Sequence, residues 1–188
     1  MSIDVQNINT SGAVVTIGGV IPFDQNPDAD DVYWGSVSGV EVGCTTGGVQ
    51  VSYKVDRQDI FCDQTLPPVD ASITGETCEV TFNMLETDAA HLKLALSQGS
   101  FVTNTNVDAK ISVGGNKIVN FVLLKLEVPD NDTGNLTTWT FFRVYSESMQ
   151  INFDRDKPSQ VQVKFTAYAD TSHPEGKQLF SIHEDLTP

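Results

Sequence analysis

The acidic run Asp24-Gln-Asn-Pro-Asp-Ala-Asp30 is the stretch whose side chains could hold a metal ion. A calcium-binding loop begins with oxygen-bearing side chains at alternate positions, as this run does. Two positions do not fit, because Ala29 stands where such a loop needs glycine and Gly35 stands where it needs a bidentate glutamate. We therefore interpret Asp24–Asp31 as a solvated acidic loop, and we expect no bound metal and no cofactor.

The cysteines and histidines are the other residues that could do nucleophilic or metal chemistry. They are Cys44, Cys62 and Cys78, and His91, His173 and His183. Neither set is spaced as zinc ligands are, so we expect free thiols in a reducing compartment, with His173 and His183 on turns or exposed edges. Nucleotide-binding, nucleophile-elbow and zinc-protease motifs are missing from the sequence. The sequence therefore predicts no catalytic residues and no enzyme.

Composition and charge narrow the classes of partner. The 188 residues, 39% of them hydrophobic and 19% charged, are typical of one globular domain over 1–188. A formal net charge of −14 repels nucleic acid and anionic membrane surfaces, which bind through Lys and Arg. No apolar run reaches the roughly 18 residues of a membrane span, and the start at Met1 lacks the pattern of a signal peptide. We expect synthesis in the cytoplasm and no membrane insertion.

Strand patterns occupy most of the chain that must position any functional residue. Apolar and polar residues alternate in Val49–Val55, in Cys78–Met84 and from Val161 to Ala167, which is typical of strands with one buried face. Further strands are expected in Val119–Val128, Leu136–Phe153 and Leu179–Ile182. A single flanking helix is predicted over about Asp88–Gln98, with Thr87 as N-cap and Gly99 after its end. These patterns predict a mainly β protein, a β-sandwich or barrel with one helix packed on its side.

The long segment Asp56–Thr77 lies between two of these strands. It exceeds the two to five residues that are usual in a hairpin turn, and such long connections commonly carry function. It keeps apolar side chains, namely Ile60, Phe61, Leu66, Val69 and Ile73. We therefore interpret Asp56–Thr77 as an inter-strand arm whose apolar tip contacts another subunit.

The order of these elements resembles a known family. The matching stretches are Trp34-Gly-x-Val-Ser-Gly39, Val42-Gly-x-Thr-x-Gly-Gly48, the strand Val49–Val55, Asp59-Ile-Phe-Cys-Asp-Gln64, Pro68-Val-Asp-Ala71, Gly75-Glu76, the strand Glu79–Leu85, and the closing run Tyr168-Ala-Asp170 with Gly176-Lys-x-Leu-Phe180. Together they are similar to the major tail protein, or tail tube protein, of long-tailed, siphophage-like bacteriophages. The likeness is densest over Val32–Gly99, whereas Ser100–Lys157 shows generic strands.

The resemblance implies a structural virion protein without catalytic activity. It implies hexameric rings that stack into a tail tube, assembled in the host cytoplasm, through which DNA passes without specific binding during ejection. It also implies contacts with a tape measure protein, a terminator and a distal tail protein. Carried over by position, the expected contact residues on the arm are Asp63, Gln64, Leu66, Pro67, Pro68, Val69 and Asp70. The lumen-lining residues, and any role of the three cysteines, stay open.

Two alternatives to a tube subunit remain at this point. One is a monomeric carbohydrate-binding or adhesion β-sandwich module that uses Tyr33, Trp34 or Trp139 with nearby carboxylates, although a tryptophan in a strand run such as Trp139-Thr-Phe141 is more typical of a core. The other is a different ring-forming tail component, a terminator or a distal tail protein, which would not polymerise indefinitely.

Overall fold

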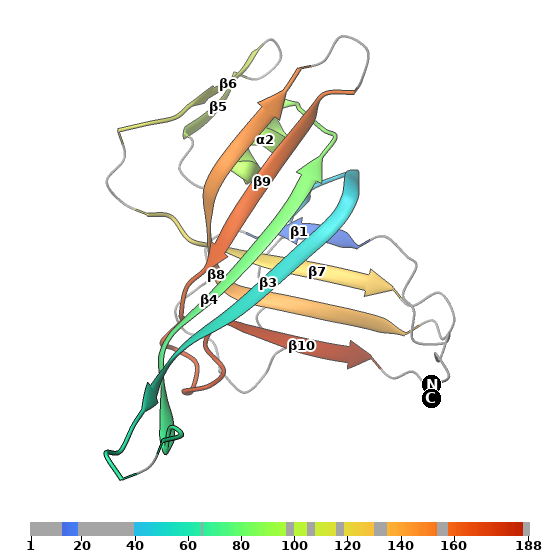
Figure 1. Cartoon of the computed structure of the whole chain (residues 1–188). Coiled ribbons are helices and arrows are strands. Elements are labelled where there is room, and N and C mark those ends of the chain that lie inside the picture. Colours follow the sequence, from blue (N-terminus) through green and yellow to red (C-terminus); the bar gives the residue numbers. More distant parts are fainter. Residues whose placement is uncertain are drawn as a thin grey trace.

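The computed structural model describes residues 13–18, 40–64, 66–96, 100–104, 108–115, 119–129, 135–153 and 158–185 (Figure 1). Its elements are β1 (Val14–Ile17), β2 (Val40–Glu41), β3 (Thr45–Ile60), β4 (Asp70–Met84), α2 (Ala89–Ala95), β5 (Ser100–Asn104), β6 (Asp108–Ser112), β7 (Val122–Pro129), β8 (Leu136–Asn152), β9 (Gln160–Ala167) and β10 (Phe180–Asp185). This confirms the predicted mainly β class, and α2 is the one helix among the described residues. Within the described ranges, no helix has the length and apolar character needed to cross a membrane.

One antiparallel sheet holds most of the strands, in the order β2-β1-β7-β8-β9-β4-β3, with β10 also paired to β8. The sheet divides at β8, because its Leu136–Val144 half pairs with β7 and β10 whereas its Val144–Asn152 half pairs with β9. We call β3, β4, β9 and Val144–Asn152 the long wing, and β1, β2, β7, β10 and Leu136–Val144 the short wing. Figure 1 shows the strands of the two wings running in different directions, and β5 and β6 form a separate small sheet.

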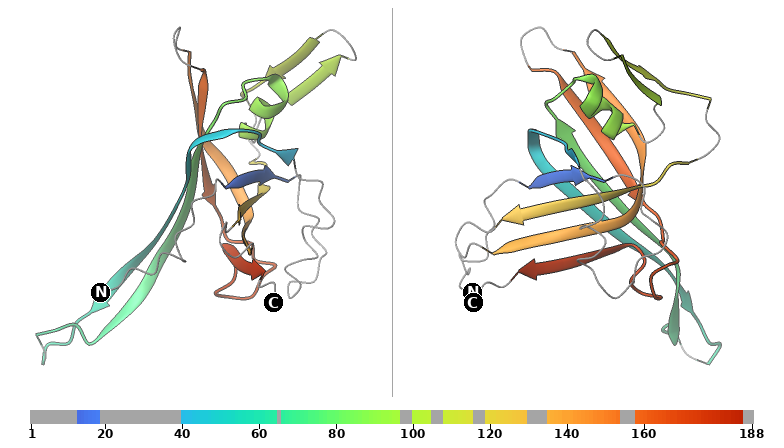
Figure 2. Two further views of the ribbon diagram at one scale, coloured as in Figure 1. Left: turned by 90° about the vertical axis from the view of Figure 1, so that its right-hand side faces the viewer. Right: turned by 180° about the vertical axis from the view of Figure 1, so that it is seen from behind.

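The buried faces of the two wings meet in one hydrophobic cluster. Alternate residues supply it from each strand, as the period of two requires. Its members include Val15 and Ile17 of β1, Val80, Phe82 and Met84 of β4, Leu124 and Leu126 of β7, Phe141 and Val144 of β8, and Val161, Val163 and Phe165 of β9. The arrangement is therefore sandwich-like, made by a single sheet that folds over its own core (Figure 2).

The helix is shorter than the sequence predicts. It covers Ala89–Ala95, and its N-cap is Asp88 rather than Thr87. The Asp88 side chain makes no capping hydrogen bond, because its carboxylate contacts His91 instead. Leu96 is the C-cap, and the predicted end at Gln98 and Gly99 lies outside the described residues. Ala95 is buried in the core cluster and its carbonyl accepts a 2.5 Å hydrogen bond from Ser146 Oγ of β8, which fixes the helix on the sheet.

The segment Asp56–Thr77 is a β-ribbon and not the long irregular loop that the sequence suggests. β3 continues to Ile60 and β4 starts at Asp70, with Arg57 paired to Ile73 and Ile60 paired to Asp70. A bulge interrupts the register between Asp56 and Arg57. A segment that leaves the body can satisfy its backbone hydrogen bonds only by pairing with itself or with water, and a two-stranded ribbon does so. The expected arm is present, but only its tip is a turn.

Candidate assembly arm and polar sheet face

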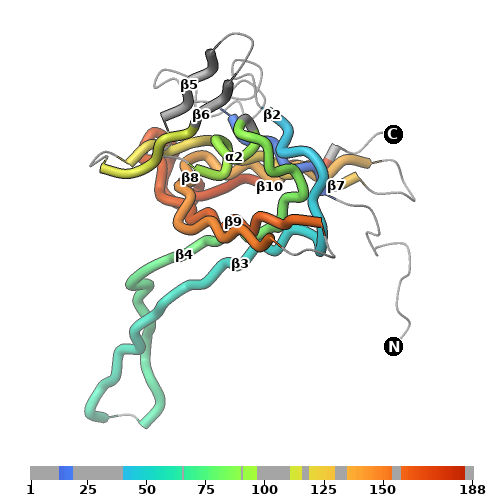
Figure 3. The backbone as a smooth tube through the Cα atoms, turned by 90° about the horizontal axis from the view of Figure 1, so that it is seen from above, coloured from blue at the N-terminus to red at the C-terminus, as the bar shows by residue number. Residues whose placement is uncertain are grey.

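The outer half of the β3–β4 hairpin forms an arm that projects from the sheet. Figures 1 and 3 show it extending past the other strands, with β3 and β4 side by side up to the tip. Its large apolar side chains are exposed: Phe61 by 66%, Leu66 by 98% and Ile73 by 64%. A ribbon of two strands has no face that can cover such residues, so they stay in water unless a partner supplies one.

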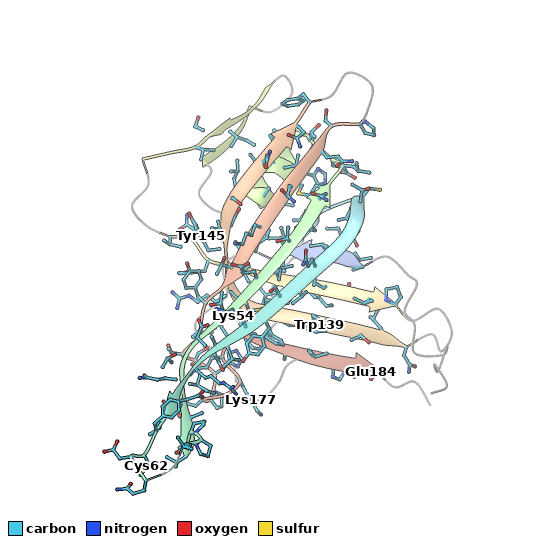
Figure 4. All side chains as sticks on the ribbon, in the orientation of Figure 1. Lys54, Cys62, Trp139, Tyr145, Lys177 and Glu184 are labelled. Carbon is cyan, nitrogen blue, oxygen red and sulfur yellow. The ribbon has the colours of Figure 1, made fainter. Side chains whose placement is uncertain are left out.

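The predicted contact residues all lie at the tip of this arm. Hairpin pairing brings Asp63 and Gln64 of the turn together with the stretch Leu66–Val69 and with Asp70, the first residue of β4. The Val69 N–H donates to the Ile60 carbonyl at 2.9 Å and closes the tip. The Cys62 thiol contacts the Gln64 side chain at the position that Figure 4 labels. Phe61 lies beside these residues and was not among the predicted contact residues. Its signal in the sequence is that it is one of the apolar side chains of the segment Asp56–Thr77.

The base of the arm contacts the short wing through one aromatic pair and carries polar contacts within the ribbon. The Tyr53 ring lies 5.7 Å from Phe180 in an edge-on contact. The Tyr53 hydroxyl donates to Glu76 Oε1 at 3.0 Å, and this hydrogen bond raises the pKa of Tyr53. On the opposite face of β3, Lys54 Nζ lies 2.6 Å from Asp56 Oδ1. The arm is thus held where it leaves the sheet.

A groove of about 810 Å³ lies beside the base of the arm. One wall is the Ile73–Thr77 stretch of β4, and the other is the segment that follows β9. β9 ends at Ala167, opposite Cys78, and none of the described strands continues along this edge of β4 from Thr77 outward, which leaves room for the groove. Tyr53, Tyr168 and Phe180 add aromatic side chains to its lining.

The outer face of the long wing is mainly polar. Alternation gives β9 Gln160, Gln162, Lys164 and Thr166 on this face, next to Glu79, Thr81 and Asn83 of β4 and Ser148, Gln150 and Asn152 of β8. Lys164 Nζ lies 2.8 Å from Glu79 and 3.0 Å from Glu147. Hydrogen bonds from Lys164 and Thr166 lower the pKa of Glu147, and those to the two carboxylates raise the pKa of Lys164. This face therefore combines neutral amides and hydroxyls with a cation already bound by carboxylates.

Both lateral edges of the long wing are open. β3 ends the sheet order, so none of the described strands pairs with its far edge over Thr45–Ile60. At the other side, β7 pairs with β8 only as far as Val144, which leaves the edge beyond it without a strand in the described part of the chain. A long unpaired edge readily accepts another strand, from a second molecule if one is available.

A cluster of Glu86, Asp88 and His91 comes closest to a metal site among the described residues. Its potential ligand atoms lie within 4.8 Å of one another. His91 Nε2 lies 2.9 Å from Glu86 Oε2, and its Nδ1 contacts Asp88, so both ring nitrogens already have carboxylate partners. Asp88 and His91 are three residues apart at the start of a helix, a spacing that brings two side chains together. The sequence therefore contains a signal for the contact between Asp88 and His91. The cluster is explained as a group of side chains that contact one another at the start of α2.

Gly43, which follows Val42, lies beside this cluster in a conformation and a space that suit glycine. Its φ is +79°, and a Cβ there would meet Glu86 Oε1 at 2.2 Å. Glu86 also accepts a 3.4 Å hydrogen bond from the Cys44 N–H. The glycine in the Val42–Gly48 stretch therefore allows the Glu86 carboxylate to approach the backbone.

Several residues that the sequence offers for carbohydrate binding or for thiol and histidine chemistry have other, structural roles or simple surface positions. Trp139 packs on the core, with ring centroids 6.5 Å from Phe141 and 5.9 Å from Phe180, whereas Tyr33, Trp34 and Asp24–Asp31 lie outside the described residues. All three cysteines are free, with Cys78 buried and the other two exposed. His183 is exposed on β10 and His173 lies in a turn, both as expected. The His173 side chain is only 4% exposed, because its ring stacks on Phe142 at 4.0 Å.

No family model matches the sequence, and no curated protein matches it. Among solved structures, a chain of "Tail of empty GTA particle computed with helical refinement, C6 symmetry" is similar to this chain, with a TM-score of 0.44 and 8% sequence identity. The match covers 84% of this chain and 91% of that one. A similarity at this level assigns no role to any residue of this chain.

Proposed function

We propose that this chain is the structural subunit of a phage-type tail tube, in which hexameric rings stack and enclose a conduit for DNA. The proposal also comprises a place in the virion tail, assembly in the host cytoplasm, and contacts with the tape measure, terminator and distal tail proteins. It follows the family resemblance of the sequence. The exposed apolar arm is the single observation that carries it.

The arm needs a partner for energetic reasons. Burying one large apolar side chain contributes about 1.5 to 3 kcal/mol, and the arm leaves Phe61, Leu66 and Ile73 mostly in water. A contact between identical subunits repeats this gain at every copy. Because the tip and the surface that it meets differ, such a contact joins copies head to tail, and this geometry builds rings or open filaments.

The open edges of the long wing support ring formation. Pairing the free edge of β3 with the free edge of β8 on the next copy would continue the sheet from subunit to subunit. It would hydrogen-bond backbone groups that are otherwise left to water, and it would remove both aggregation-prone edges when the ring closes. In such a ring, the hydrophobic face of each long wing stays against its own core and the polar face lines the other side of the continuous sheet.

The polar face suits the wall of a DNA conduit. DNA binds protein chiefly through cations that neutralise phosphates. Lys164 is held between Glu79 and Glu147, and Lys54 lies against Asp56, so the cations described on this face are already paired with carboxylates. Together with the net charge of −14, this would let DNA slide without adhering.

The test of the proposal removes the tip of the arm. One variant lacks Leu66–Val69 and a second replaces these four residues by Gly-Ser-Gly-Ser, which preserves the length of the arm but not its apolar side chains. We expect both to keep the far-ultraviolet circular dichroism of the unaltered protein and to remain small by light scattering at concentrations where the unaltered protein polymerises. Normal polymerisation of the deletion variant would show that the arm is not the assembly contact.

A further inference from the structure

The groove beside the base of the arm has a composition that suggests what it binds. Tyr53, Tyr168 and Phe180 present aromatic rings, and Ile73 is 64% exposed at its rim. Along one wall, β4 offers the unpaired edge of Ile73–Thr77. Aromatic-lined grooves favour extended proline-containing segments, and free strand edges favour extended backbones. The groove therefore fits a short, extended, apolar peptide that contains proline.

We propose that this groove receives the Leu66-Pro67-Pro68-Val69 tip of a second copy's arm. The inference rests on the proposed function and deepens it, because it names the surface on which the tip docks. Two adjacent prolines favour an extended conformation before binding, which lowers the entropic cost of docking on aromatic rings. Leu66, at 98% exposure, is the most exposed large apolar side chain of the described residues and would gain most from burial.

The tip of the same chain cannot occupy this groove. Tyr53 lines the groove, and the seven residue steps from Tyr53 to Ile60 extend over roughly 23 Å at about 3.3 Å per residue. Figures 2 and 3 show the ribbon leading away from the body without folding back. The partner must therefore be another molecule. A row of tip-in-groove contacts leaves a free tip at one end of the assembly and a free groove at the other end.

Asp63 at the tip and Lys177 beside the groove carry opposite charges, although Glu76 also lines the groove. Asp63 lies at the tip with the Cys62 labelled in Figure 4, and Lys177 lies at the base beside the groove-lining Gly176 and Gln178. Within the described part of the chain, neither side chain takes part in an ion pair. Docking of the tip would bring a carboxylate close to an ammonium group and would favour this orientation of the two copies.

The first experiment combines two defective variants. Ile73→Asp places a charge in the groove but leaves the tip intact, whereas the Gly-Ser-Gly-Ser variant keeps the groove but lacks the tip. We expect neither to polymerise alone, and we expect an equimolar mixture to form complexes that stop growing after one tip-to-groove layer. Ile182→Asp is the matched control, because Ile182 is 52% exposed outside the groove, and this variant should polymerise normally.

The second experiment detects the contact directly. Ala169→Cys, made in a Cys44→Ser background, places a thiol in the groove, and Cys62 supplies the native thiol at the tip. Mild oxidation of the assembled protein should form an intermolecular disulfide between positions 62 and 169, which requires their Cα atoms to come within about 7 Å. Glu184→Cys in the same background is the control and should form no such link.

The outcomes separate the two proposals. Tubes that form without the 62–169 disulfide, and that also form from Ile73→Asp, would overturn the groove as the docking surface while leaving the tube subunit standing. A protein that forms neither tubes, rings nor mixed complexes would overturn both.

Discussion

The inner and outer halves of the β3–β4 ribbon have the same hydrogen-bond pattern but opposite environments. In the inner half, Cys78, Val80, Phe82 and Met84 are at most 1% exposed, whereas Ile73 in the outer half is 64% exposed. The change occurs where β9 ends, at Ala167 opposite Cys78. Strand pairing alone therefore does not decide whether a side chain is buried. The neighbouring strand and the core beneath it decide this.

The contrast assigns different roles to two apolar groups on one hairpin. The inner residues stabilise the fold, and their contacts are complete within one chain. The outer residues contribute little to the stability of the fold, since they are largely exposed to water. Their contacts become complete only in an assembly. Substitutions should therefore affect stability in one half and association in the other.

The largest expected effect on stability is from Phe82→Ala in the inner half. Phe82 is 1% exposed and stacks on Phe165 at 5.9 Å, so truncation leaves a cavity and should lower the free energy of unfolding by about 3 to 5 kcal/mol. Ile73→Ala in the outer half is the matched control and should change it by less than about 0.5 kcal/mol. Urea denaturation followed by circular dichroism checks both values. Equal losses in the two variants would remove the distinction between the halves.

A smaller effect on the free energy of unfolding is expected from ionisation of Cys78, the buried thiol of the inner half. Cys62 at the tip is the exposed thiol for comparison. Burial raises the pKa of Cys78 to about 11, whereas an unfolded chain releases the thiol proton near pH 9. Between these values the unfolded state binds fewer protons, so the free energy of unfolding should fall with rising pH, by on the order of 2 to 3 kcal/mol.

This pH dependence is tested by urea titrations from pH 8 to pH 11. In Cys78→Ala the decrease should be smaller than in the unaltered protein, whereas Cys62→Ala should leave it unchanged. In the folded protein at neutral pH, a thiol reagent should modify Cys44 and Cys62 and leave Cys78 intact. Superimposable pH curves for the two variants would contradict the assignment.

The smallest effect on stability is expected on the polar face of the long wing. Replacing Glu79 and Glu147 by lysine removes both partners of Lys164, yet this face is solvated and the fold should persist. Three unpaired cations would instead attract phosphate, so assembled tubes should retain double-stranded DNA at low salt and release it as salt rises. Glu175→Lys with Glu184→Lys gives the same change in net charge off this face. Equal DNA retention by both variants would argue against the polar face as the conduit wall.

The sequence predicts the covered strands well and the uncovered ones poorly. In Cys78–Met84 and Val161–Ala167, one face is buried and the other is solvated, and selection for burial produces the alternation that identifies a strand. In Asp56–Ile60 and Asp70–Thr77, both faces are in water, so nothing imposes alternation and the ribbon looks like a loop. The apolar tip was recognisable by composition, because apolar side chains in a long connection need an explanation.

The spatial features of the site depend on contacts that local patterns do not contain. The groove arises from the end of β9 relative to β4 and from the path of the chain before Phe180, which are distant in sequence. The start of α2 was misplaced for a similar reason. The Asp88 carboxylate contacts His91 rather than capping, and Glu86 approaches Gly43 and His91 across the sheet edge.

Negative-stain electron microscopy of the concentrated protein, beside the Gly-Ser-Gly-Ser tip variant, tests the tube subunit most directly. The account predicts hollow tubes of uniform width with six-fold end views for the unaltered protein, and no tubes for the tip variant at the same concentration. Rings that never stack would instead indicate a terminator or distal tail component. Tubes of the same length and number from both proteins, or monomers of the unaltered protein at every concentration, would contradict the account.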